Sequence, residues 1–199
     1  MIPLKKFILP LIILVHLFLI FLSAGQLFYG DETVYIIPAQ EIAAGNSSGH
    51  MVYSDGKLID NSMLMHPPTY IYLLSLVISL FGKSPYAIRS VSAIFSIGVL
   101  ILIYLITDRI LKKREVKNHN IWALIACSLY AISPMAIQNS ILVEIDGGLL
   151  NFFLLLFIYF YTSQKKFVYL FLSLFMIFWS KLTVPPLLFG SLLLLNLGA

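Results

Sequence analysis

Tyr29-Gly30-Asp31-Glu32 follows directly on the first long apolar segment, residues 7–23, and determines how the rest of the chain can be arranged. A carboxylate beside a bilayer costs little free energy in water and much in hydrocarbon. Asp31 and Glu32 therefore indicate where the chain leaves the membrane. We expect the polar residues that follow to fold back over the membrane toward this acidic pair and to form the mouth of a functional site.

The composition is that of an integral membrane protein. Of the 199 residues, 60% are hydrophobic and 11% are charged, and the mean hydropathy is +0.94. Soluble domains have roughly half apolar and about a quarter charged residues. The net charge of +4 comes from lysines and arginines confined to short segments. This pattern is typical of orientation signals and not of a nucleic-acid-binding surface.

The N-terminal segment is interpreted as an uncleaved anchor. Lys5 and Lys6 precede the apolar residues 7–23, and the positive-inside rule places them in the cytoplasm. The apolar run is longer than the 7 to 15 residues of a signal peptide. His16 lies near its middle, where we expect a neutral imidazole bonded to a neighbouring helix.

The segments on either side of Gly82 decide the topology. Residues 70–81 are apolar but short for a span, whereas residues 87–106 are long enough. If only the second segment crosses, the basic cluster at 109–117 lies in the cytoplasm, as the charge rule prefers. Residues 70–81 are therefore expected along the outer face, and residues 33–44 as another short interfacial helix.

The sequence thus predicts an all-α fold, a polytopic membrane helix bundle that forms a single transmembrane domain over residues 1–199. About six spans are expected, at residues 7–23, 87–106, 121–137, 147–161, 167–179 and 185–197. A large first extracytoplasmic loop, residues 24–86, contains the short interfacial helices. The N-terminus is cytoplasmic in this arrangement.

Acidic and basic side chains gather on the predicted outer side. They are Asp31, Glu32, His66, Arg89, Glu144, Asp146 and Lys181. Acidic residues contribute little to orientation, so the charge rule does not require them there. Either the outer loops are polar because they meet water, or these residues form an extracytoplasmic site.

The order of three motifs resembles a known family. An apolar span precedes Asp31-Glu32, His66-Pro67-Pro68 precedes a short apolar helix, and Phe81-Gly82-Lys83-Ser84-Pro85-Tyr86-Ala87-Ile88-Arg89 follows it. This order resembles the N-terminal part of the GT-C membrane glycosyltransferases, in particular the protein mannosyltransferase and aminoarabinose transferase group. The resemblance covers nearly all of the chain. It implies transfer of a sugar from a polyprenyl-phosphate carrier to an acceptor on the outer face of the membrane.

The resemblance also implies roles for individual residues. Asp31, paired with Glu32, corresponds to the catalytic aspartate, and an ionised carboxylate there could take the acceptor's proton as general base. The matching binding residues are His66, Arg89 and Asp146, with Glu144 in the same outer loop. Lys181 lies in Ser180-Lys181-Leu182-Thr183, which lacks the glycine of the family's Thr-Lys-Gly-Pro segment.

The chemistry suits these residue types. A guanidinium such as Arg89 can hold the oxygens of a departing phosphate with paired donors. His66 could act as a second donor or as a ligand to a divalent metal, so a metal cofactor is left open. The expected partners are a polyprenyl-phosphate-linked sugar, the lipid bilayer and a protein, glycan or lipid acceptor, with no nucleic acid.

Two other interpretations remain at this point. A transport component would handle the same lipid-linked sugar without chemistry, and would be expected to carry inverted repeats and charges inside its spans. A non-catalytic membrane partner is the second alternative. The chain stops within an apolar run, so we expect it to be the N-terminal part of a longer enzyme. The sugar, the acceptor and the choice between a dolichyl and an undecaprenyl carrier are not determined.

Overall fold

The computed structural model describes residues 5–28, 30–46, 51–52, 58–59, 69–164, 166–181 and 183–188. The helices are α1 (Lys5–Ser23), α2 (Gly30–Ala43), α3 (Thr69–Phe81), α4 (Pro85–Lys113), α5 (His119–Ile132), α6 (Pro134–Ile141), α7 (Gly148–Thr162) and α8 (Phe167–Ser180). Two-residue strands β1 (Met51–Val52) and β2 (Leu58–Ile59) pair antiparallel. The predicted all-α fold class is confirmed apart from this small hairpin.

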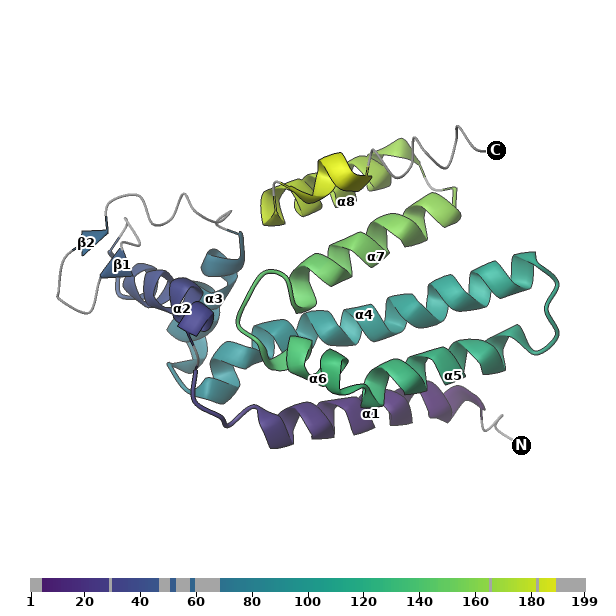
Figure 1. Ribbon diagram of the computed structural model, residues 1–199, viewed down its shortest axis with the longest axis horizontal. Helices are drawn as coiled ribbons and strands as arrows, with labels where there is room; N and C mark the ends of the chain where they lie inside the picture. The colour runs from purple at the N-terminus through teal and green to yellow at the C-terminus, as the bar shows by residue number, and fades with distance from the viewer. Residues whose placement is uncertain are drawn as a thin grey trace.

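The longest helix, α4, forms the centre of the molecule. It packs against α1, α5, α6 and α7, and α8 covers the other side of α7. Figure 1 shows α2 and α3 together at the end where α1 finishes and α4 begins. The α4–α5 connection lies at the opposite end. The fold therefore has two ends, separated by the length of α4.

The boundaries of α4 follow from its sequence. The hydroxyl of Ser84 caps the helix by accepting the Ala87 N–H at 3.2 Å, and Pro85 occupies the first turn, where a missing N–H costs nothing. Lys112 and Lys113 end it, in the turn where cations complement the helix dipole. The predicted span at 87–106 is confirmed as helical but was too short, because good helix formers continue it for two more turns.

The span predicted at 121–137 corresponds to two helices with a break between them. α5 and α6 meet at Pro134 with a bend of 63°. Proline lacks the N–H that would continue the helix and disfavours helical geometry at Ser133, whose φ and ψ are −64° and 127°. The chain then resumes as α6, which begins with the bond from Ile137 N–H to Ser133 O at 3.0 Å.

A buried histidine joins three helices near this break. His16 of α1 has no exposed surface, and its Nδ1 donates to the Ala131 carbonyl of α5 at 2.8 Å. Its Nε2 lies 2.8 Å from Oγ of Ser96 in α4. The Ala131 carbonyl lies in the last turn of α5, where the helix itself supplies no partner. The expected bond between His16 and a neighbouring helix is confirmed.

Four other helix predictions agree with the structure within two residues at each end. Segments 7–23, 70–81, 147–161 and 167–179 correspond to α1, α3, α7 and α8. The interfacial helix expected at 33–44 corresponds to α2, which begins three residues earlier. Of the last expected span, 185–197, the described part of the chain includes a helical turn at 184–188.

Length and composition identify fewer membrane spans than the six expected. Within the described ranges, α4 alone is long and apolar enough to cross a membrane, and α5 with α6 would pass as one broken span. The apolar helices at 7–23, α3, α7 and α8 are shorter.

Candidate functional site

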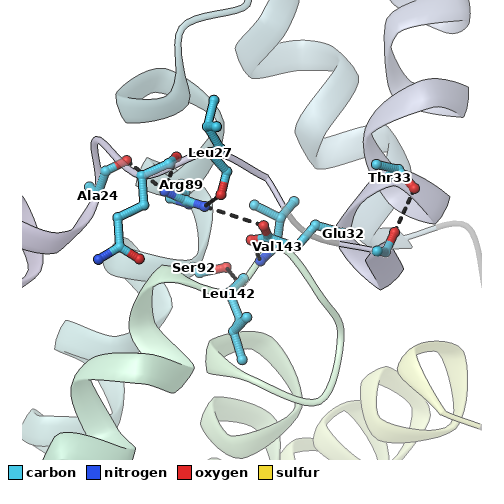
Figure 2. Close-up of polar contacts among 10 residues, drawn as sticks. Ala24, Leu27, Glu32, Thr33, Arg89, Ser92, Leu142 and Val143 are labelled. Carbon is cyan, nitrogen blue, oxygen red and sulfur yellow. Dashed lines mark hydrogen bonds and ion pairs between the residues drawn. The ribbon is translucent and has the colours of Figure 1, made fainter.

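Glu32 and Arg89 form a buried ion pair at the end of the molecule that carries α2 and α3. Oε2 of Glu32 lies 3.2 Å from Nη2 of Arg89, and the two side chains are 4% and 3% exposed. Glu32 comes from the first turn of α2 and Arg89 from the second turn of α4. Figure 2 shows the pair enclosed by the connection after α1 and by the loop before α7. We call Glu32, Arg89 and their hydrogen-bond partners the Glu32–Arg89 centre.

Arg89 holds the connection between α1 and α2. Its Nη1 donates to the carbonyls of Ala24 and Gln26 at 2.8 and 2.7 Å, and its Nη2 donates to Leu27 at 3.2 Å. The guanidinium also lies 4.9 Å from the ring centroid of Phe28. These carbonyls follow the end of α1 and have no helical partner, so a fork of donors satisfies groups that would otherwise be costly to bury.

The other carboxylate oxygen of Glu32 holds the loop between α6 and α7. Oε1 accepts the Val143 N–H at 2.9 Å. The adjoining Leu142 carbonyl accepts from the Ser92 hydroxyl at 2.7 Å, and Tyr70 Oη lies 2.6 Å from the Ser92 oxygen. Because the single proton of Ser92 goes to Leu142, Tyr70 must donate in the second bond. α2, α3 and α4 are thus all joined to one loop.

Burial raises the pKa of the Tyr70 hydroxyl, with smaller contributions from Glu32 and Glu144 in the same direction. Tyr70 is therefore protonated throughout the physiological range, as its role as donor requires. The negative charges of Glu32 and Glu144 lie close enough to act on Tyr70.

Two glycines allow the start of α7 to approach α4 and α6 closely. A Cβ atom at Gly148 would lie 2.6 Å from the Ser92 carbonyl oxygen, and one at Gly147 would lie 2.6 Å from the Asn139 carbonyl oxygen. Any larger residue would displace backbone here. The glycine pair therefore fixes the position of the loop that Glu32 and Ser92 hold.

Asp146 and Lys181 form a second, exposed ion pair at the same end. Nζ of Lys181 lies 2.5 Å from Oδ2 of Asp146, and the side chains are 41% and 50% exposed. Asp146 precedes α7 and Lys181 follows α8. Thr69 at the start of α3 donates to the Trp179 carbonyl at 3.3 Å, which joins α3 to this corner. Unlike the Glu32–Arg89 centre, this pair is open to a ligand.

The structure brings five of the seven expected site residues to one end of the fold. Glu32 and Arg89 are in contact, Asp146 and Lys181 are in contact, and Glu144 lies half-buried between Val143 and Asp146. Asp31 belongs to the first turn of α2, but its side chain lies outside the described part. His66 lies outside the described residues altogether, so its expected role as donor or metal ligand is not addressed.

The expected direct contact between Arg89 and a phosphate does not fit this geometry. Four of the five guanidinium protons go to carbonyls and to Glu32, and Nε is buried without a hydrogen-bond partner among the described residues. A ligand could reach Arg89 only by displacing the α1–α2 connection. We therefore interpret Arg89 as a positioning residue that fixes Glu32 and the entry to α2.

The roles of two participants were not predicted from the sequence. Tyr70 was expected in a short apolar helix, among tyrosines that could stack on a sugar or form an aromatic belt, and Ser92 only in the segment after Arg89. A signal for Ser92 does exist, because Ser92 and Ser96 are small residues four positions apart, a spacing found where helices pack closely in membrane bundles. No group of three metal-binding side chains occurs among the residues with described positions.

Comparison with known proteins identifies the class. The dolichyl-phosphate-mannose-protein mannosyltransferase family matches residues 65–196, about two thirds of the chain. The chain belongs to this family, whose members are membrane glycosyltransferases. No curated protein and no solved structure matches it significantly. The match includes α3 to α8 with Arg89, Glu144, Asp146 and Lys181, and begins after Asp31 and Glu32.

Proposed function

We propose that the protein transfers a sugar from a polyprenyl-phosphate donor to an acceptor on the extracytoplasmic face of a membrane, with Asp31 as general base. The observation that carries the proposal is the position of Asp31, which adjoins the buried Glu32 in the first turn of α2. Glu32 is fixed by Arg89 and by the Val143 N–H. A rigid support of this kind is what a catalytic carboxylate needs to reach a productive geometry.

The orientation follows from the charges at the two ends of α4. Arg89 and Arg109 are 20 residues apart, which is about 30 Å along a helix and matches the thickness of a bilayer's hydrocarbon core. The end with Arg109, Lys112 and Lys113 is cytoplasmic by the positive-inside rule. The Glu32–Arg89 centre is then extracytoplasmic. We extend this orientation to a six-span bundle formed by α1, α4, α5 with α6, α7, α8 and the segment that begins at 184.

The proposed reaction needs two groups with different environments. The acceptor's hydroxyl or amine attacks the anomeric carbon of the sugar while the bond from that carbon to the phosphate oxygen breaks. Asp31 takes the acceptor's proton, and the polyprenyl phosphate leaves with the bonding electrons. The departing phosphate gains negative charge, which an exposed cation stabilises.

Lys181 is the cation we assign to the phosphate. Its side chain is 41% exposed and its ammonium is held by Asp146, so an incoming phosphate could share or replace that partner. Arg89 is unsuited to this task because its Nη donors are engaged within the chain and its Nε is buried. The carrier's phosphate would stay at headgroup depth, where Asp146 and Lys181 lie in the proposed orientation.

The decisive test is Asp31→Asn in the protein as the gene encodes it. Membranes containing the variant would be supplied with mannosyl-phosphoryl-dolichol or mannosyl-phosphoryl-undecaprenol, and sugar transfer to endogenous acceptors would be measured. We expect transfer to fall at least about 100-fold, since general bases contribute that much or more. Normal transfer in this variant would exclude Asp31 as the base.

A matched control lies on the same helix. Glu41 lies in the last turn of α2, and its carboxylate accepts from the Asn46 amide at 2.6 Å, away from the Glu32–Arg89 centre. Glu41→Gln removes one charge as Asp31→Asn does, and should leave both transfer and membrane insertion unchanged. If the wild-type protein itself shows no transfer with any donor, a non-catalytic role replaces the proposal.

A further inference from the structure

The end of the molecule opposite to the Glu32–Arg89 centre contains a cleft with cationic walls. Two adjoining hollows of about 530 and 750 Å³ lie between the last turns of α4 and of α7. They share Arg109, Lys113, Thr162 and Gln164, and the first also includes Lys112 while the second includes Arg114. Figure 1 shows these two helices side by side, with their C-terminal ends directed away from α2 and α3.

The positive charge of this cleft is not neutralised within the described part of the chain. Arg109 donates to the Ser163 carbonyl at 3.3 Å, and the structure gives Lys112, Lys113 and Arg114 no side-chain partner there. Asp108, the carboxylate that lines the cleft, is bound to His119 Nδ1 at 2.6 Å. The cleft thus presents four cations against one acidic group that already has a partner.

A cluster of basic residues at a cytoplasmic boundary ordinarily needs no explanation beyond orientation. Two features of this cluster are not explained by orientation alone. The cations surround a hollow that also contains a hydroxyl and an amide, from Thr162 and Gln164. The bond from Arg109 to Ser163 fixes the guanidinium across the two helices. A defined hollow with a fixed guanidinium and polar walls is suited to one bound anion and not only to a diffuse lipid surface.

We propose that this cleft is a binding site for a phosphate group, carried by an anionic lipid headgroup or by a soluble phosphate compound. Arg109 and Lys113, which line both hollows, are the main ligands, and Lys112 and Arg114 add charge at the rim. The site is independent of the transfer reaction, because about 30 Å of α4 separates it from the Glu32–Arg89 centre. Occupation would join the C-terminal ends of α4 and α7.

The experiment measures lipid retention. The protein is reconstituted in nanodiscs of phosphatidylcholine containing one fifth phosphatidylglycerol, extracted into mild detergent, and examined by native mass spectrometry for bound phosphatidylglycerol. Wild type should retain it. Arg109→Gln with Lys113→Gln should reduce its affinity about tenfold or more, since hydrogen bonds to charged groups are among the strongest. Retention equal to wild type would overturn the proposal.

The matched control is Lys117→Gln. Lys117 is an exposed lysine beyond the end of α4 and does not line either hollow. An equal loss in Lys117→Gln would mean that general surface charge holds the lipid, and would also overturn the proposal. If the double variant fails to insert, Lys112→Gln and Lys113→Gln are tested singly, with a loss of about threefold expected in each and none in Lys113→Arg.

A second arm distinguishes the sources of the phosphate. The nanodisc sample is exposed to 10 mM inorganic phosphate, or to sodium chloride of the same ionic strength. Displacement of phosphatidylglycerol by phosphate alone would assign the site to a soluble phosphate compound. Retention under both conditions, with loss in the double variant, would assign it to a lipid headgroup.

Discussion

Nη2 of Arg89 lies 3.2 Å from Oε2 of Glu32, and this contact between residues 57 positions apart in the sequence joins α4 to α2. Both groups are almost fully buried, so neither charge can be screened by water. The other Nη donors of Arg89 and the second oxygen of Glu32 bind backbone groups of two connections. The pair is therefore the point at which α2, α4 and the loop before α7 are held in one arrangement.

Glu32→Ala should strongly destabilise the protein. Removing the carboxylate leaves Arg89 as a buried, uncompensated charge and leaves the Val143 N–H without its acceptor. Breaking one partner of a buried pair typically costs about 3–5 kcal/mol in the free energy of unfolding. Unfolding by sodium dodecyl sulfate in mixed micelles would measure the loss.

The exposed pair provides the comparison. Asp146→Ala removes a carboxylate from an ion pair whose side chains are about half exposed, and such pairs contribute only about 0–1 kcal/mol. Equal destabilisation by Glu32→Ala and Asp146→Ala would contradict the structural role assigned to the buried pair.

Gly148→Ala should also destabilise the fold, by about 1–3 kcal/mol. The new methyl group would lie 2.6 Å from the Ser92 carbonyl oxygen, which belongs to the backbone of α4 and cannot move aside. α7 would have to shift away from α4 and take the loop at 142–147 with it. A thermal unfolding midpoint measured in detergent would reveal the change.

Gly98→Ala is the matched substitution on α4 itself. Its methyl group would lie 2.5 Å from the ring of Phe152, a side chain that can rotate. We expect a smaller loss of stability than for Gly148→Ala. The reverse order would indicate that α7 adapts at its start more easily than at Phe152.

The proposed orientation predicts where single cysteines react. In a Cys127→Ser background, Asp146→Cys should react with a membrane-impermeant maleimide added from outside intact cells, and Lys117→Cys should react only after the cells are opened. Both positions are exposed, and Cys127 is buried. Labelling of Lys117→Cys from outside would exclude the arrangement in which α3 does not cross.

The helices could be predicted from the sequence because the length of an apolar segment and the glycines and prolines that bound it are local properties. Residues 70–81 end just before Gly82, residues 147–161 begin with a glycine pair, and each boundary agrees with α3 and α7 within two residues. The bend at Pro134 was missed although proline is a local signal, because hydropathy continues across it.

For the site, the sequence could predict which residues lie at one end of the bundle, but not the contacts between them. Arg89 was expected on the same side of the bundle as the acidic pair, and it lies against Glu32, but its bonds to Ala24, Gln26 and Leu27 depend on the path of the chain after α1. Hydropathy carries no information on that path. A charged residue read as a ligand for substrate can therefore prove to be bonded within the protein.

Lys181→Ala should weaken use of the donor without affecting the fold. Its ammonium is exposed and its only described partner, Asp146, is also exposed, so loss of the pair should cost at most about 1 kcal/mol in stability. If Lys181 binds the phosphate of the carrier, the KM for the polyprenyl-phosphate donor should rise about tenfold, as expected for a charge-assisted hydrogen bond. Lys181→Arg should retain most of the affinity for the donor. Lys83→Ala, which removes an exposed lysine before α4, should change neither the KM nor the stability. Donor titrations of transfer in membranes would measure all three variants, and an unchanged KM in Lys181→Ala would exclude the assignment of this lysine to the phosphate.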